Sequence, residues 1–194
     1  KAGFDGFIGK PIDPDRFPST LLTGPETGVE GELHTESLAR GVRLIVEPNL
    51  VRRLSPWHDL MATYRLWRAM RGSRYDVVHT HSSKAGILGR IAARFAGVPV
   101  IVHTAHGWGF NREQPPHIHR FYVWLERMCA RFTSAIVVVG TPTRDEGLAL
   151  GIGRPEQYRL IRSGIEIQSY RDVAISREQA RDRLGLPRES FVIG

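Results

Sequence analysis

From residue 75 onward, short apolar runs alternate with longer segments whose apolar residues recur at helical spacing. The apolar runs are nearly continuous and rich in β-branched residues, which predicts buried strands at residues 75–81, 98–104, 135–139 and 158–161. The segments between them predict helices at residues 84–96, 117–132 and 142–150, with Gly97 as a C-terminal cap and Thr141 as an N-terminal cap. Strands that alternate with helices over short links indicate right-handed crossovers. We therefore expect an α/β fold with a doubly wound, mainly parallel, Rossmann-like sheet.

The region before residue 75 shows a less regular pattern of the same kind. Residues 30–40 predict a helix, residues 42–46 a strand, and Ser55-Pro56 the start of a further helix. This last helix is expected to have one apolar face, made of residues that recur at helical spacing: Trp57, Leu60, Met61, Tyr64 and Trp67. The chain opens on Lys1 and stops after the apolar run 191–193, so we expect a fragment truncated at both ends.

Composition narrows the class of protein. The chain has 194 residues, 41% of them hydrophobic and 24% charged, which excludes a disordered or collagen-like protein. No apolar run approaches the ~18 residues that a membrane-spanning helix needs, and no signal-peptide pattern is evident, so a cytoplasmic protein is expected. The single cysteine, Cys129, excludes an internal disulfide and a cysteine-based zinc site.

The net charge is +7, from 27 basic and 20 acidic residues. Much of the excess lies between residues 51 and 74, where Asp59 is the only acid among six arginines, at positions 52, 53, 65, 68, 71 and 74. Two interpretations stay open: a solvated basic helix surface, or a surface that attracts anionic lipid head groups or phosphorylated substrates. Nucleic acid is not expected as a partner, because aromatic residues do not interleave with the basic ones on a strand surface.

Four segments in order resemble those of a known enzyme family. Residues 80–90, Thr-His-Ser-Ser-Lys-Ala-Gly-Ile-Leu-Gly-Arg, resemble the strand-loop-helix of family 4 glycosyltransferases with the GT-B fold. Residues 103–110 resemble the next strand and its His-Gly loop, residues 136–140 a strand that often ends in Ser-Glu, and residues 160–165 a Pro-Asn-Gly-Val segment. The resemblance covers about residues 20–194 and implies the N-terminal, acceptor-side domain.

The opening residues have a second, shorter resemblance. Residues 1–21 are similar to the end of a response-regulator receiver domain, in which a Lys-Pro pair follows the fifth strand. Lys10 and Pro11 occupy those two positions. The alternative is that these residues are a strand and a turn of the glycosyltransferase half.

The two resemblances imply a division of the chain. We expect a receiver-like remnant at residues 1–21, the glycosyltransferase acceptor-side domain at 22–190, and the start of a nucleotide-binding domain at 191–194. The family's Gly-rich first loop and its donor-binding domain with paired glutamates are absent from this pattern. The fragment alone is therefore expected to be inactive.

Histidines gather at the predicted strand ends. His79 and His103 lie within apolar runs and are expected to be structural, whereas His81 and His106 lie at strand C-termini, where open α/β sheets bind ligands. His106 is the candidate catalytic residue, because in the resembled family a histidine before this glycine faces the donor sugar. No metal site is expected, since carboxylates do not accompany the histidines.

The remaining candidates surround the same two strand ends. We expect a substrate site lined by His81, Ser82, Ser83, Lys84, Gly86, Gly107 and Trp108. Hydroxyls, free N–H groups and a cation at a helix N-terminus favour anions, although N-capping by Ser82 or Ser83 explains the serines equally well. Trp108 and Phe110 either stack on a sugar or lipid-linked acceptor or pack within the loop.

The family resemblance implies transfer of a sugar from a nucleotide-sugar donor to a glycan or lipid-linked acceptor. Retention at the anomeric carbon, no metal or other cofactor, and contact with an anionic membrane surface on the cytoplasmic side are part of that expectation. Three alternatives stay open: a response-regulator signalling module, a non-catalytic acceptor-binding or interaction domain, and a metal hydrolase.

Overall fold

The computed structural model describes residues 18–25, 37–39, 41–51, 53–111, 113–164, 167–168, 175–187 and 189–192. The chain divides into two compact units, residues 1–162 and residues 163–194. Lys10 and Pro11, with most of the receiver-like segment, lie outside the described residues, as do residues 30–36 of the expected first helix. The proposed boundaries at residues 21 and 190 stay predictions.

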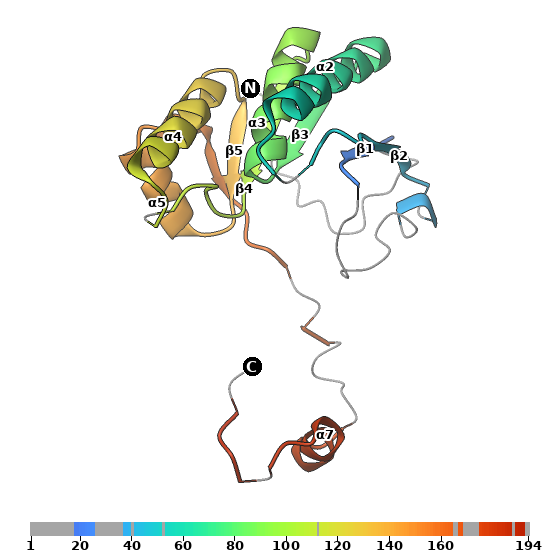
Figure 1. The fold of residues 1–194 in the computed structure, drawn as a ribbon, viewed down its shortest axis with the longest axis vertical. Coiled ribbons are helices and arrows are strands. Elements are labelled where there is room, and N and C mark those ends of the chain that lie inside the picture. Colours follow the sequence, from blue (N-terminus) through green and yellow to red (C-terminus); the bar gives the residue numbers. More distant parts are fainter. Residues whose placement is uncertain are drawn as a thin grey trace. The chain divides into compact units, whose positions relative to one another are not determined.

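Every strand pairing in the described part of the chain is parallel (Figure 1). A two-stranded sheet joins β1 (Thr20–Thr23) to β2 (Arg43–Val46). A four-stranded sheet has the order β3-β4-β5-β6, made of Val77–His81, Val100–Ala105, Ala135–Val138 and Tyr158–Leu160. The parallel α/β fold expected from the sequence is thus confirmed. The strands expected at residues 75–81, 98–104 and 135–139 lie side by side as β3, β4 and β5.

The helices follow the strands in alternation. They are α2 (Pro56–Ser73), α3 (Ser83–Ala96), α4 (Pro116–Ala130) and α5 (Thr141–Ala149), and a 3-10 turn at Pro155–Gln157 precedes β6. Because the strand order advances by one at each crossover, right-handed connections carry the helices to one face of the sheet. None of the helices in the described parts of the chain is long and apolar enough to cross a bilayer.

Two apolar clusters hold the helices to that face. One joins α2 and α3 to the sheet through Leu66, Met70, Ala92, Ala93 and Ile101. The other lies under α4 and α5 and contains Ala105, Phe110, Val123, Ala130, Ile136, Val138, Ile152 and Tyr158. Each large aliphatic side chain removed from water contributes about 1.5–3 kcal/mol, so these clusters fix the strands that end at the candidate site.

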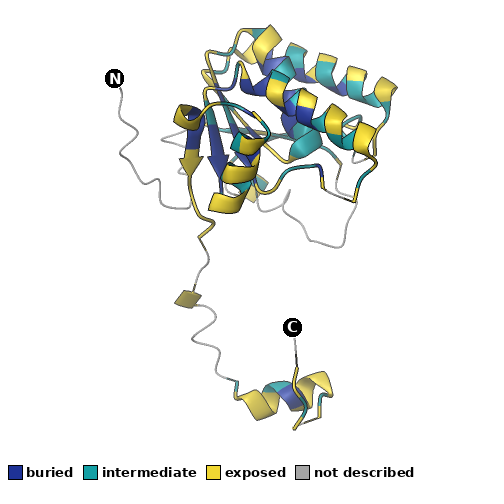
Figure 2. Cartoon of the chain, turned by 90° about the vertical axis from the view of Figure 1, so that its left-hand side faces the viewer, coloured by how far each residue is buried: buried dark blue, intermediate teal, exposed yellow. Residues whose placement is uncertain are grey.

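The apolar face expected for α2 is not the face that packs. The buried residues of the helix are Ala62, Leu66 and Met70. Trp57, Leu60 and Tyr64 are 68%, 62% and 49% exposed, whereas Trp67, which was expected on the same face, packs against this cluster. Leu66 and Met70 face inward because the small Ala92 and Ala93 of α3 accept them. Figure 2 shows exposed turns along the helices.

Helix ends match the sequence only in part. Gly97 ends α3 with φ 79°, a left-handed conformation that favours glycine, as expected. At α5 the cap is Gly140, whereas Thr141 is already the first helical residue. At α3 the cap is Ser82, but its side chain makes no capping hydrogen bond. The predictions of capping by the Thr141 and Ser82 hydroxyls are therefore wrong.

The second unit contains the helix α7 (Arg177–Leu184). Its N-terminus has a capping box: the Ser176 hydroxyl accepts from the Gln179 N–H, and the Ser176 N–H donates to the Gln179 side chain. The Arg181 guanidinium donates to the carbonyls of Pro187 and Ser190, which closes the turn that follows.

Candidate functional site

The candidate site lies at the edge of the sheet where the parallel strands β3 and β4 end. His81 is the last residue of β3 and pairs in register with Thr104 of β4. His106 follows β4 directly, so the topology brings two histidines 25 residues apart to one edge. Ligands of open α/β sheets bind outside the carboxyl ends of the strands, which is where both side chains lie.

His81 and His106 form a hydrogen-bonded pair. The Nδ1 atom of His81 lies 3.3 Å from the Nε2 atom of His106, and the two rings stack with centroids 5.6 Å apart. Both residues are exposed. Loss of surrounding water and the proximity of His106 lower the pKa of His81, so its ring is neutral at pH 7. A hydrogen bond at this distance has one facing nitrogen as donor and the other as acceptor, which leaves the outer ring nitrogens for other partners.

His79 lies behind this pair on the same face of β3. Its ring centroid is 4.3 Å from that of His81, and its Nε2 is 2.7 Å from the Thr104 hydroxyl. Loss of water around the ring, followed by the proximity of His81 and His106, lowers the pKa of His79 to about 4. His79 is therefore a neutral residue that is hydrogen-bonded to Thr104 within the sheet.

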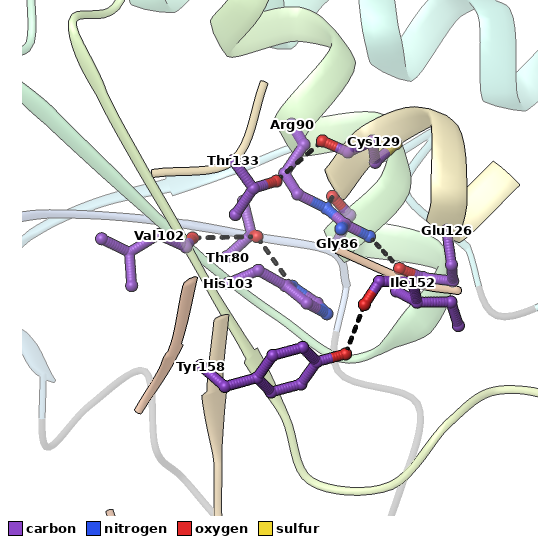
Figure 3. Close-up of polar contacts among 10 residues, drawn as sticks. All are labelled: Thr80, Gly86, Arg90, Val102, His103, Glu126, Cys129, Thr133, Ile152 and Tyr158. Atoms are coloured by element: carbon purple, nitrogen blue, oxygen red, sulfur yellow. Dashed lines mark hydrogen bonds and ion pairs between the residues drawn. The ribbon is translucent and has the colours of Figure 1, made fainter. Parts of the chain in front are cut away.

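The opposite face of the same two strands holds a buried histidine. His103 is 2% exposed, and its Nδ1 is 3.0 Å from the Thr80 hydroxyl, which in turn donates to the Val102 carbonyl (Figure 3). Burial above all, and then the charge of Arg90, lower the pKa of His103 to about 2. The expectation of a satisfied structural histidine is confirmed here.

Gly86 packs in this buried layer. A Cβ atom at Gly86 would lie 2.6 Å from the His103 ring, so only glycine lets α3 approach β4 this closely. The structure thus gives Gly86 a packing role, and its expected role in substrate binding stays a prediction.

A buried ion pair links α3 to α4 next to His103. The Nη2 atom of Arg90 is 2.7 Å from Oε2 of Glu126, and both residues are at most 2% exposed. Arg90 Nε also donates to the Gly86 carbonyl, as Figure 3 shows. Sequence reasoning missed this pair, because no local pattern joins two residues 36 positions apart.

Ser82 and Ser83 line the turn between β3 and α3. Ser82 has φ 59° and ψ 168°, a region that side chains rarely adopt and that is found where a site over-determines the backbone. Ser83 lies under the second loop: a Cβ atom at Gly109 would come 2.2 Å from the Ser83 hydroxyl. The two loops at the edge therefore contact each other closely.

Lys84 is already paired. Its Nζ lies 2.5 Å from the Asp59 carboxylate of α2 and donates to the backbone carbonyls of Val51 and Arg53. The cation expected to attract an anion is neutralised by Asp59, so in this structure Lys84 fastens the start of α2 to the start of α3.

Trp108 packs within its loop. Its indole N–H donates to the Thr143 carbonyl at 2.9 Å, its ring stacks on the buried Phe110 with centroids 5.8 Å apart, and it touches Gly147. Of the two alternatives for this aromatic pair, the packed loop is the one the structure shows. Gly107 differs, because a side chain there would meet nothing within 4 Å. That glycine leaves open space beside His106.

No group of three or more His, Cys, Asp or Glu side chains in the described residues is arranged to hold a metal ion. Cys129 is buried, and burial above all raises the pKa of its thiol to about 11, so it is a core residue without nucleophilic character.

Comparison with known proteins decides the family. Residues 15–164 match the model of the glycosyl transferase 4-like domain. The chain belongs to this family. The match starts within the segment that resembles a receiver domain, and nothing in it supports a receiver, so that resemblance stays a prediction. Membership in the glycosyl transferase 4-like family does not favour the signalling or interaction-module alternatives.

Curated relatives of this glycosyl transferase 4-like chain are enzymes. It is 35% identical over 159 residues to the Escherichia coli UDP-Gal:alpha-D-GlcNAc-diphosphoundecaprenol alpha-1,3-galactosyltransferase, which covers 81% of this chain and 41% of that protein. It is 29% identical over 140 residues to the putative glycosyltransferase EpsD of Bacillus subtilis, covering 69% of this chain and 36% of that protein. The chain thus spans about two fifths of the length of these relatives.

Solved structures agree on the fold. Anabaena Alr3699/HepE, solved in complex with UDP and glucose, superposes with a TM-score of 0.60 at 20% identity over 84% of this chain and 42% of that one. A glycosyltransferase from Rickettsia africae superposes with a TM-score of 0.59 at 14% identity, over 87% and 50% of the two chains. The parallel α/β unit is therefore the Rossmann-like half of a GT-B glycosyltransferase fold.

Proposed function

We propose that the protein transfers a sugar from a UDP-sugar donor to an acceptor sugar carried on a lipid diphosphate, at the edge formed by His81 and His106. The observation that carries this proposal is the hydrogen-bonded histidine pair, 3.3 Å apart, at the carboxyl end of two parallel strands. The kinds of donor and acceptor are taken from the relative named as a galactosyltransferase acting on a diphosphoundecaprenol-linked sugar.

In this reaction the protein positions the donor and the acceptor and stabilises the charge that develops in the transition state. The bond from the anomeric carbon to the diphosphate breaks, the acceptor hydroxyl oxygen forms the new bond, and the hydroxyl proton leaves with the diphosphate. His106, beside the open space at Gly107, would hydrogen-bond the sugar as positive charge develops at the anomeric carbon. His81 would fix the ring of His106 through the hydrogen bond between the two rings.

We further propose that the reaction retains the anomeric configuration and needs no metal ion. The relative's name gives its product an α-1,3 linkage, which is retention for a donor whose sugar is α-linked to UDP. The His81–His106 pair supplies hydrogen-bonding groups at the strand ends that can contact the donor sugar directly, which supports a reaction without a metal ion. We also propose that residues 1–194 alone do not catalyse the transfer. Stabilisation of the leaving diphosphate is a large electrostatic contribution, and the chain spans only about two fifths of the length of its relatives.

The test is a transfer assay with the active enzyme, UDP-galactose and a GlcNAc-diphospholipid. We expect a disaccharide product with an α linkage, identified by NMR, and an unchanged rate in EDTA. A β-linked product would contradict retention, and a rate abolished by EDTA and restored by Mg²⁺ would contradict metal independence. Product formation by residues 1–194 alone would contradict the proposed inactivity of this unit. Failure of every nucleotide sugar tried would contradict the proposed reaction itself.

The same proposal puts the protein at the cytoplasmic face of a membrane, where a lipid-linked acceptor has its head group. The relative's acceptor is such a lipid.

A further inference from the structure

The ammonium group of Lys84 has an unusually complete set of partners for a lysine beside a candidate site. It forms an ion pair with the Asp59 carboxylate at 2.5 Å and donates to the carbonyls of Val51 and Arg53, which occupies its three N–H donors. The side chains of Lys84 and Asp59 are only 16% and 20% exposed, so water and salt screen their attraction little. We call these four groups the Lys84 cluster.

The Lys84 cluster joins the start of α2 to the start of α3, which lie side by side (Figure 1). Asp59 belongs to the first turn of α2, where its second carboxylate oxygen accepts from the Ser55 N–H at 3.3 Å. Lys84 is the second residue of α3. The apolar contact that contains Leu66 and Ala92 lies about 10 Å farther along the helices, at 1.5 Å per residue. The Lys84 cluster therefore fixes α3 against α2 at the end near the candidate site.

Two residues before Lys84, the backbone is strained. Ser82 has φ 59° and ψ 168°, in a region that is nearly restricted to glycine. Arg74, the other non-glycine residue with a positive φ in the described part of the chain, has ψ 52° and so lies in the ordinary left-handed helical region. Serine keeps the conformation of Ser82 only where contacts on both sides hold the chain. Before it, His81 pairs with Thr104 in the sheet, and after it comes the Lys84 cluster.

The strained turn touches both halves of the histidine pair. His81 directly precedes Ser82, and its ring is hydrogen-bonded to His106 at 3.3 Å. Ser83 directly follows Ser82 and lies against the loop that carries His106, because a Cβ atom at Gly109 would be 2.2 Å from the Ser83 hydroxyl. A change in the backbone of Ser82 would therefore move His81 and the His106 loop relative to each other.

We propose that Lys84 and Asp59 are positioning residues, which hold Ser82 in its strained conformation and thereby keep His81 and His106 within hydrogen-bonding distance. The effect on sugar transfer rests on the proposed function, whereas the effect on the geometry of the pair does not. The competing role for Lys84 is direct binding of a substrate anion. That role requires Lys84 to leave Asp59, since its donors already have acceptors.

The first experiment measures the geometry in the 194-residue chain by NMR. In the parent we expect a nuclear Overhauser contact between the ring protons of His81 and His106, whose centroids are 5.6 Å apart. Lys84→Met and Asp59→Ala should each lose this contact, because either change lets Ser82 relax to an unstrained conformation. A role in stability alone would lower the thermal midpoint of both variants and leave the contact in place.

The second experiment measures kcat and KM of the same variants in the active enzyme. Lys84→Met and Asp59→Ala should each lower kcat by about tenfold to hundredfold with KM within about twofold of the parent, because displacements of about 1 Å suffice for such losses. The double variant should lose no more than Lys84→Met alone, since both changes break one interaction. Direct binding of an anion by Lys84 gives a different pattern, in which Lys84→Met raises KM and Asp59→Ala lowers it.

A third variant tests whether the Lys84 cluster acts through Ser82. Glycine adopts the conformation of Ser82 without strain, so a chain with Ser82→Gly has less need of the cluster. Added to Ser82→Gly, Lys84→Met should lower kcat by only about twofold and should leave the His81–His106 contact in place. A loss as large as that in the parent background would overturn the role of Ser82.

The matched control breaks another ion pair of the same helix. Arg65→Met removes a guanidinium group that lies 3.6 Å from the Glu47 carboxylate, and that carboxylate keeps its two hydrogen bonds from Asn49. This control should retain the His81–His106 contact and should change kcat by no more than about twofold.

Parent kcat and an intact ring contact in both Lys84→Met and Asp59→Ala would overturn the inference, and so would an equal loss in Arg65→Met. A parent enzyme that transfers no sugar would overturn the proposed function alone, because the ring contact in the 194-residue chain still decides the role of the Lys84 cluster. An enzyme that transfers sugar equally well with and without Lys84 and Asp59 would overturn this inference alone.

Discussion

The two faces of β3 and β4 put the same residue type to different uses. On one face, His103 is buried, bonded to Thr80 and next to the Arg90–Glu126 pair. On the other face, His81 is exposed and is hydrogen-bonded to His106, which lies just beyond the end of β4. Since alternate residues of a strand point to opposite faces, one position along the chain separates a structural side chain from a candidate functional one.

The comparison shows that burial and hydrogen-bond partners, rather than residue type, distinguish a structural histidine from a candidate catalytic one. The buried face has partners built from α3 and α4, so its polar atoms serve stability. The exposed pair lies beside the open space at Gly107, and its outer nitrogens have no hydrogen-bond partner among the described residues, which suits the pair to a ligand. Variants on each face should therefore separate stability from activity.

The largest effect on stability is expected at the buried ion pair. Glu126→Leu leaves the Arg90 charge without its carboxylate in the interior, which should cost about 3–5 kcal/mol of unfolding free energy. Arg90→Met/Glu126→Leu removes both charges and should recover most of that loss. Chemical denaturation of the three proteins gives both numbers, and equal destabilisation in the single and double variants would show that the pair is not what stabilises this face.

Acid is expected to lower the free energy of unfolding through the protonation of His103. The folded protein keeps this ring neutral, with a pKa near 2, whereas the unfolded chain takes up a proton near pH 6.5. Because the unfolded state binds the extra proton, the stability that His103 contributes is lost as the pH falls below 6.5, and the loss reaches about 3 kcal/mol at pH 4. The parent should therefore lose about 3 kcal/mol more unfolding free energy than His103→Gln when the pH falls from 7 to 4. Chemical denaturation of both proteins at the two pH values measures this difference.

Thr80→Val is the matched control for the acid effect. It removes the hydrogen-bonding hydroxyl beside His103 without adding or removing a titrating group. It should lower stability at every pH while keeping the parent's pH slope. A Thr80→Val slope as flat as that of His103→Gln would assign the acid sensitivity to other groups.

A smaller effect is expected at Gly86. The added methyl of Gly86→Ala would lie 2.6 Å from the His103 ring, so α3 or the ring must shift, at a cost of about 1–3 kcal/mol. If Gly86 instead lined the substrate site, the same variant would raise KM with an unchanged thermal midpoint. Gly72→Ala on α2, where the added methyl meets no other atom within 4 Å, is the control and should not destabilise.

The sequence predicted most of the fold because parallel strands carry a strong local signal. The continuous apolar runs at β3, β4 and β5 and the turn at Gly97 needed only composition and spacing. The inward face of α2 could not be predicted in this way, because two sets of residues recur at helical spacing: Trp57, Leu60 and Tyr64, and Ala62, Leu66 and Met70. Only the small residues on α3 decide between the two stripes, and they are distant in sequence.

The candidate site was predicted less completely for the same reason. His81 and His106 were identified from their places at strand ends, and the structure brings them together. The pairing of Lys84 with Asp59, the packing of Trp108 against Thr143 and Gly147, and the contact of Gly86 with His103 all join distant parts of the chain. No motif or periodicity in one sequence encodes such contacts.

The central claim is that His81 and His106 take part in catalysis, whereas the other histidines of β3 and β4 stabilise the fold. The measurement is kcat and thermal midpoint for His106→Ala in the active enzyme, with His79→Ala as the control from the supporting set. We expect His106→Ala to lower kcat by ~10²–10⁴ with an unchanged midpoint, and His79→Ala to lower the midpoint with activity per folded molecule nearly unchanged. A stable His106→Ala enzyme with full activity would contradict the account.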